Sequence, residues 1–231
     1  MDYFLRMTMK RLIHIIVMLC TLWFPFFTNV FADDLLQDQS KGRELYIRIF
    51  GGYGTDETLI RILQGNIWLD DERTGILGFQ AGTPLAKRVG NTSWDLLANA
   101  AIVRHLERDL QSDFNEYTLG LQAYFDGFPW QQYLRTRFGI ATGLSYAEQI
   151  PAMERESLEE KGSNTSHLLL HADVSLDFNL GDIFRTKKLD ACYFGFSVWH
   201  RSGLFGELAI FNNVDGGYNW LSLELECIYR L

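Results

Sequence analysis

Long stretches of this sequence alternate apolar and polar residues, and this alternation limits the folds that the chain can adopt. Within residues 167–180, Leu168 and Leu170 occupy even positions, whereas His171 and Asp173 occupy odd ones. Successive side chains of a β-strand point to opposite faces, so this pattern predicts a strand with one apolar and one polar face. Ordinary strands average about five to six residues, whereas strands that cross a bilayer need about 9 to 11. The length of the stretch therefore favours a strand that crosses a membrane.

The same period of two recurs along the rest of the chain. Further candidate strands occupy residues 44–54, 75–82, 93–106, 116–127, 133–146, 190–203 and 219–231. They bring the total to about eight, the number found in the smallest transmembrane β-barrels. Backbone groups in lipid must all be paired, so such a sheet has to close on itself. We therefore expect an all-β fold, an antiparallel transmembrane β-barrel of about eight strands with a polar interior.

Alternation alone also fits a soluble exported β-barrel that binds a small apolar ligand, because the polar faces would then be its wet outside. The length of the strands and the aromatic content of 14% favour the membrane barrel, whose strands carry aromatic girdles.

The N-terminus has the parts of a secretory signal peptide. Three basic residues precede an apolar run at residues 12–27, and Ala32 is a small residue suited to cleavage. A signal anchor is the alternative, but a proline interrupts the run. We expect residues 1–32 to be a signal peptide, residues 33–43 a periplasmic lead-in, and residues 44–231 the barrel. An exported barrel of this kind belongs in the bacterial outer membrane.

The connections between the expected strands differ in length. With both ends of the barrel in the periplasm, the short connections at residues 126–132 and 179–188 fall on the periplasmic side. The long charged loop at residues 148–166 and the connection that follows Ser202 fall outside. Residues 55–65 are expected to form a short helical turn, capped by Thr55 or Asp56.

A formal net charge of -8 argues against a nucleic-acid partner, because such partners need basic patches.

The charges on the polar faces indicate what fills the barrel. We expect the inward residues Arg135, Arg137, Glu224 and Glu226 to form a salt-bridge network. For the inward residues His167, His171, Asp173 and Asp177 we expect a solvated hydrogen-bond network rather than a metal site. The Cys and His spacing does not suggest zinc, and we expect no cofactor.

Cys192 and Cys227 are the two cysteines of the expected barrel. Export allows a disulfide, and pairing of the last two strands as a hairpin brings these residues to the same end. Alternatively, both are small apolar residues on a buried or lipid-facing surface, and we favour this second interpretation.

The strand at residues 190–203 carries the candidate catalytic residues. His200 and Ser202 are two positions apart and share the apolar face of the strand, which looks toward lipid at the level of the outer leaflet. A serine becomes a nucleophile when a neighbouring base takes its proton, and a third group orients the base. We expect Ser202 as nucleophile, His200 as base, Asp215 as the orienting acid with Glu207 as second choice, and the Gly203 amide in an oxyanion hole.

At these residues the chain resembles the lipid A 3-O-deacylase (acyloxyacyl hydrolase-like) family of outer-membrane barrels. The resemblance implies hydrolysis of an acyl ester of lipid A, with His200 matching the base and Ser202 the nucleophile of the family. This chain has Gly203 where the family pattern has Asn. It also resembles a group of bacterial barrels that share His-Arg-Ser-Gly-x-Phe-Gly, Gly-Gly-x-Asn, Phe-Pro-Trp and Gly-Leu-Ser-Tyr. These runs occur here at residues 200–206, 216–219, 128–130 and 143–146.

The sequence thus predicts an outer-membrane β-barrel that acts as a lipid A deacylase, with an outer-leaflet lipid (lipid A or lipopolysaccharide) as its partner. A non-catalytic structural or adhesion barrel is the alternative, in which His200 and Ser202 only lie among lipid headgroups.

Overall fold

The computed structural model of the chain describes residues 43–204 and 206–231. The predicted signal peptide and the lead-in, apart from Arg43, lie outside the described residues. Among the residues that are described, no helix has the length and apolar character needed to cross a membrane.

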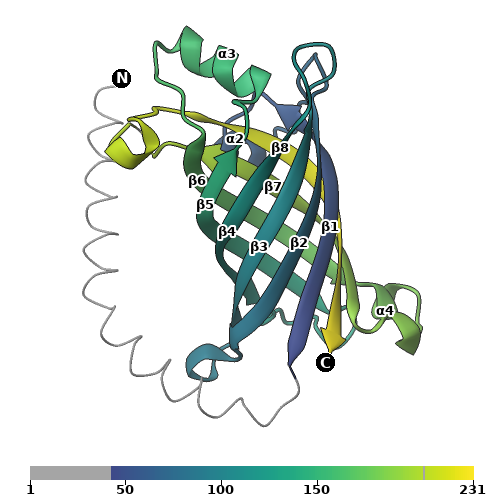
Figure 1. Cartoon of the computed structure of the whole chain (residues 1–231). Coiled ribbons are helices and arrows are strands. Elements are labelled where there is room, and N and C mark those ends of the chain that lie inside the picture. Colours follow the sequence, from purple (N-terminus) through teal and green to yellow (C-terminus); the bar gives the residue numbers. More distant parts are fainter. Residues whose placement is uncertain (1–42, 205) are drawn as a thin grey trace. The chain divides into compact units, whose positions relative to one another are not determined.

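The described part is a closed barrel in which each strand pairs with the next and β1 pairs with β8 (Figure 1). All eight pairings are antiparallel. The strands are β1 (Glu44–Thr55), β2 (Gly75–Ala86), β3 (Trp94–Leu106), β4 (Phe114–Phe125), β5 (Thr136–Ala147), β6 (Leu168–Asn179), β7 (Cys192–Ser202) and β8 (Gly217–Arg230). The predicted fold class and the number of strands are confirmed.

Short helices occupy the connections at the two ends of the barrel. They are α2 (Leu59–Leu63), α3 (Ala152–Glu160) and α4 (Leu180–Ile183), with single 3-10 turns at Val89–Asn91, Lys187–Leu189 and Ala209–Phe211. We call the end at which β1 begins and β8 ends the terminal end, and the opposite one the far end. Figure 1 shows α3 over the far end and α4 beside the terminal end, near the C-terminus.

The predicted loop at residues 148–166 connects β5 and β6 and contains helix α3. Two expectations about other segments were wrong in detail. The N-cap of α2 is Thr58, whose side chain accepts a hydrogen bond from the Arg61 amide, and not Thr55 or Asp56. Strand β2 continues to Ala86, with an irregularity in its pairing between Pro84 and Ala86.

The outer face of the strands is a belt of exposed apolar side chains. Leu119 is 67% exposed and Phe196 57%. Other members of this belt are Ile49, Leu77, Phe79, Ile102, Leu121, Ile140, Leu144, Leu176 and Leu223. Exposed apolar surface of this extent is unfavourable in water and favourable in lipid, so the outer face is built to contact a bilayer.

Three buried arginines fill the interior, and each lies between two carboxylates. Toward the terminal end, Arg137 lies 3.2 Å from Asp177 and 2.9 Å from Glu226. Arg48 pairs with Asp173 and Glu224. Toward the far end, Arg201 lies 2.9 Å from Glu154 and 3.8 Å from Glu116. Buried charges need partners of opposite sign, and each of these arginines has two.

The predicted interior network is therefore confirmed for Arg137, Glu224 and Glu226, but not for Arg135. Arg135 precedes β5 at the terminal end, where it binds Asp182 and Asp190, each at 2.8 Å. Its side chain is 39% exposed, because it lies one residue beyond the strand and outside the lumen.

Cys192 and Cys227 form a disulfide near the terminal end, so the interpretation as two unpaired apolar residues was wrong. The two residues are direct partners in the β7–β8 pairing. Directly opposite residues of an antiparallel pair have closely spaced Cβ atoms, which brings the two sulfur atoms within bonding reach.

Candidate functional site at the far end of β7 and β8

His200 and Ser202 lie at the far end of β7, on the outward face as predicted. Both are half-buried, whereas Trp199 and Arg201 between and beside them point into the barrel and are fully buried. The alternation of the strand therefore separates an outward pair from an interior pair.

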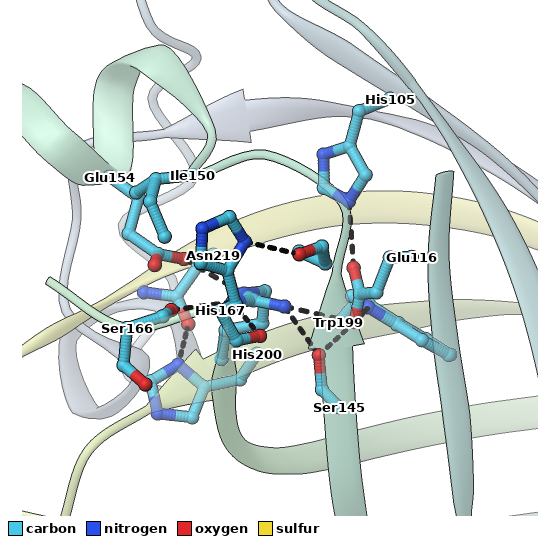
Figure 2. Close-up of polar contacts among 12 residues, drawn as sticks. His105, Glu116, Ser145, Ile150, Glu154, Ser166, His167, Trp199, His200 and Asn219 are labelled. Atoms are coloured by element: carbon cyan, nitrogen blue, oxygen red, sulfur yellow. Dashed lines mark hydrogen bonds and ion pairs between the residues drawn. The ribbon is translucent and has the colours of Figure 1, made fainter. Parts of the chain in front are cut away.

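His200 faces Asn219 across the β7–β8 pairing. The His200 Nδ1 atom lies 2.7 Å from the Asn219 Oδ1 atom (Figure 2). The Asn219 Nδ2 group donates a hydrogen bond of 2.8 Å to the backbone oxygen of Glu57, in the β1–β2 connection. From the sequence alone, Asn219 is recognisable only as the end of the Gly-Gly-x-Asn run. Only the register of the β7–β8 hairpin shows that Asn219 lies opposite His200.

Ser202 lies two residues beyond His200 and opposite Gly217. Its Oγ atom accepts a hydrogen bond of 3.2 Å from the Leu204 amide. Among the hydrogen bonds of the described residues, none joins the His200 and Ser202 side chains. In unliganded sites, catalytic hydrogen bonds are often formed only when substrate binds.

The Gly203 amide is not aimed at an oxyanion position, so this expectation was wrong. It donates a hydrogen bond of 3.0 Å to the backbone oxygen of Gly216 and so continues the hairpin. A Cβ atom at position 203 would lie 2.2 Å from the backbone oxygen of Val214. This close approach explains why glycine stands at position 203.

Asp215 and Glu207 lie in the connection between β7 and β8. The backbone amide of Asp215 donates a hydrogen bond of 2.7 Å to Ser163 Oγ, beyond helix α3. The described partner of His200 Nδ1 is Asn219. The role of Asp215, and that of Glu207 as second choice, stays a prediction.

A buried polar cluster lies on the inner side of the barrel wall, and Figure 2 shows several of its residues together with His200. Glu116 accepts hydrogen bonds from Ser145 at 2.7 Å and from Trp199 at 3.3 Å, and it lies 2.7 Å from His105 Nε2. Arg201 connects this cluster to Glu154, which helix α3 inserts into the end of the barrel. The cluster fixes the inner face of β7 where its outer face carries His200.

A cavity of about 510 Å³ adjoins Asn219 at the far end. It lies between the β1–β2 connection, helix α3 and the start of β8, with Asp56, Met153, Glu160 and Tyr218 in its lining. Burial and the neighbouring Asp70 carboxylate raise the pKa of Asp56.

Metal-ligand geometry is absent from the described part of the chain, where no three His, Cys, Asp or Glu residues are grouped to hold an ion. His171, Asp173 and Asp177 point into the barrel as predicted. His167 instead lies at the far end, where its Nδ1 is 2.7 Å from the backbone oxygen of Ala147.

Taken together, the closed antiparallel barrel, the apolar outer belt and the charged interior define the class of protein. This chain is an eight-stranded β-barrel of the bacterial outer-membrane type.

No family model matches the chain, and comparison with curated proteins finds no match. Among solved structures, the chain is similar to the outer membrane enzyme PagL, with 8% identity over 79% of this chain and 98% of that one, at a TM-score of 0.48. The N-terminal β-barrel domain of Pseudomonas aeruginosa OprF is 10% identical over 82% of this chain and 99% of that one, with a TM-score of 0.42. Ail, the attachment invasion locus protein of Yersinia pestis, is 13% identical over 81% of this chain and 99% of that one, with a TM-score of 0.36. At these values the assignment rests on the barrel itself.

Proposed function

We propose that this protein hydrolyses an acyl ester of a lipid in the outer leaflet, with lipid A as the substrate. The observation that carries the proposal is the outward pair of His200 and Ser202 at the far end of β7, with His200 held through one ring nitrogen by a neighbouring strand. An ester substrate reaches this pair from the bilayer without crossing the barrel wall.

In the proposed reaction, Ser202 Oγ attacks the ester carbonyl carbon while His200 Nε2 takes the serine proton. The tetrahedral intermediate collapses, the bond between the carbonyl carbon and the ester oxygen breaks, and His200 returns the proton to the departing alkoxide. Water then attacks the acyl-serine with His200 again as base, which releases the fatty acid and restores Ser202. No cofactor takes part in these steps.

Several features support a lipid substrate over a soluble one. The face that carries His200 and Ser202 is continuous with the apolar belt, in which Phe196 precedes them on the same face of β7. The resemblance of the His-x-Ser strand end to the lipid A deacylase family points the same way.

A structural or adhesion barrel is the second candidate, and one observation favours it. Three residues of the His-Arg-Ser-Gly run make contacts that hold the far end together. Arg201 binds helix α3, Ser202 accepts from the Leu204 amide, and Gly203 continues the hairpin. In this candidate function, the run serves only to fasten the far end of the barrel.

The two candidates are separated by mass spectrometry of lipid A. Wild type, Ser202→Ala and His200→Ala are expressed as full chains in a lipid A-bearing host. Thr142→Ala, which removes an exposed hydroxyl from the outer face of β5, is the matched control. We expect one acyl chain to be lost with wild type and Thr142→Ala, and retained with the other two. Unchanged lipid A in all four strains would falsify the proposed hydrolase activity, provided that heat-modifiable migration on gels shows folded barrels in the membrane.

A further inference from the structure

We propose that Asn219 is the positioning residue of this site and that it holds His200 as the neutral tautomer with its proton on Nδ1. The catalytic consequence rests on the proposed function, but the tautomer itself does not. This inference assigns to a neutral amide the role that we predicted for the carboxylate of Asp215.

The orientation of the Asn219 amide follows from its second contact. The backbone oxygen of Glu57 can only accept a hydrogen bond, so the atom 2.8 Å away from it must be the amide nitrogen of Asn219. The amide oxygen therefore faces His200. The pair of contacts removes the ambiguity that usually attends an Asn side chain.

The tautomer of His200 follows from the amide orientation. An amide oxygen accepts but never donates, so the ring nitrogen 2.7 Å away must carry a proton. In a neutral ring, the other nitrogen, Nε2, then has a free lone pair. Nε2 is thus the atom that can take the proton of Ser202, as the base in a serine hydrolase must.

The contact is also rigid. Asn219 is 4% exposed and lies inside the continuous pairing of β8 with both β7 and β1, opposite His200 on one side and Thr55 on the other. A hydrogen bond between cross-strand neighbours needs little ordering when substrate binds. Preorganisation of this kind is what a positioning residue contributes.

An amide and a carboxylate differ in one measurable property. Both orient the ring, but only a carboxylate adds a negative charge that stabilises the doubly protonated imidazolium. Replacing Asn219 by Asp should therefore keep the proton on Nδ1 and make the charged ring persist to higher pH. Replacing it by Ala should release the ring from the Nδ1 tautomer.

The direct test is nitrogen-15 NMR of the histidine rings in the full chain, folded in detergent micelles. A His200→Gln spectrum identifies the signals of His200. We expect wild type to show the Nδ1-protonated tautomer, Asn219→Ala to shift the ring toward the Nε2-protonated form, and Leu221→Ala, the next outward position of β8, to leave it unchanged.

Asn219→Asp keeps the test decisive if Asn219→Ala does not fold. Its ring should retain the Nδ1 proton and titrate at a higher pH than that of wild type. A wild-type ring protonated on Nε2, or a ring whose titration is unmoved by Asp at position 219, overturns the inference.

A separate activity assay tests the catalytic role of Asn219, by measuring lipid A deacylation in the same micelles. We expect Asn219→Ala to lower kcat about tenfold or more with little change in KM. For Asn219→Asp, we expect the acid side of the pH profile to move to higher pH, because His200 must be neutral to act as base. If wild type hydrolyses no lipid while the NMR result stands, the proposed function fails and the positioning of His200 by Asn219 is retained.

Discussion

Arg201 Nε lies 2.9 Å from Glu154 Oε2, and both side chains are fully buried. The two residues come from different parts of the far end, one from the inner face of β7 and the other from helix α3. Glu107 adds a second attachment, because its carboxylate accepts a hydrogen bond of 2.8 Å from the Ala152 amide at the start of α3. Burial raises the pKa of Glu107. Helix α3 is therefore fastened from inside the barrel.

This attachment predicts that Glu154→Ala loosens α3. Removing one partner of a buried ion pair costs about 3–5 kcal/mol, because the other charge is left unpaired. We expect residues 148–167 to be cleaved by added protease faster than in wild type while the folded barrel persists on gels. Glu159→Ala, at an exposed position of the same helix, is the control. Equal cleavage rates for the two variants would mean that the ion pair does not hold the helix.

The interior arginines give a second prediction, for the centre of the barrel. Arg48→Met leaves Asp173 and Glu224 buried without their cation, so the free energy of unfolding in urea should fall by about 3–5 kcal/mol. Arg61→Met, which removes an arginine that is 59% exposed, should change it by less than about 1 kcal/mol.

A compensating variant tests the cause of that loss. Adding Asp173→Asn and Glu224→Gln to Arg48→Met removes the unpaired charges and should restore part of the stability. No recovery in the triple variant would indicate that the loss comes from packing around the Arg48 side chain instead.

Much of the barrel was predictable from sequence, because a period of two is a local signal. The inward side of β6 was identified from alternation alone, and the structure confirms it for His171, Asp173 and Asp177. Alternation also placed His200 and Ser202 on the outward face of β7. It does not define where a strand ends, which is why Arg135 was assigned to the interior although it lies one residue before β5.

The partners within the site were not predictable, since they depend on register. The contact between His200 and Asn219 joins residues 19 positions apart and exists only for one alignment of β7 on β8. The disulfide of Cys192 and Cys227 depends on the same alignment. The fit of Gly203 against Val214 depends on how the connecting loop folds, which no local pattern encodes.

The disulfide gives a third prediction. Denatured protein should react with a maleimide reagent at Cys192 and Cys227 only after reduction. The bond closes a loop with a separation of 35 residues, for which the chain-entropy model gives a stabilisation of about 3–4 kcal/mol. The double change of both cysteines to serine should therefore unfold at lower urea than wild type. Labelling of these cysteines before reduction would show that they are not joined.

Gly203 gives a fourth prediction. Gly203→Ala places a Cβ atom 2.2 Å from a backbone oxygen, so the hairpin must shift, at a cost of about 1–3 kcal/mol. Gly51→Ala is a matched control, because its Cβ atom meets its nearest neighbour at 3.4 Å. Urea unfolding of both variants measures the difference, and an equal loss in the two would show that position 203 is not tightly packed.

Asp182 gives a fifth prediction, at the terminal end. Hydrogen bonds from the Arg135 side chain, followed by one from its backbone amide at 2.8 Å, lower the pKa of Asp182 below its ordinary value of 3.8. A carboxyl whose pKa is lowered by folding binds fewer protons in the folded state. Its stabilisation is therefore fully present above the ordinary value and is lost as the pH falls through the lowered one.

We accordingly expect Asp182→Asn to speed hydrogen exchange of residues 180–191 relative to wild type at pH 7. The difference should persist down to about pH 4 and shrink at lower pH, where wild type also carries a neutral side chain at position 182. Comparing the two proteins at each pH cancels the intrinsic dependence of exchange on pH. Asp109→Asn, at an exposed position between β3 and β4, controls for the loss of one charge. A difference that stays constant down to pH 2.5 would show that the ionised carboxylate does not hold this connection to Arg135.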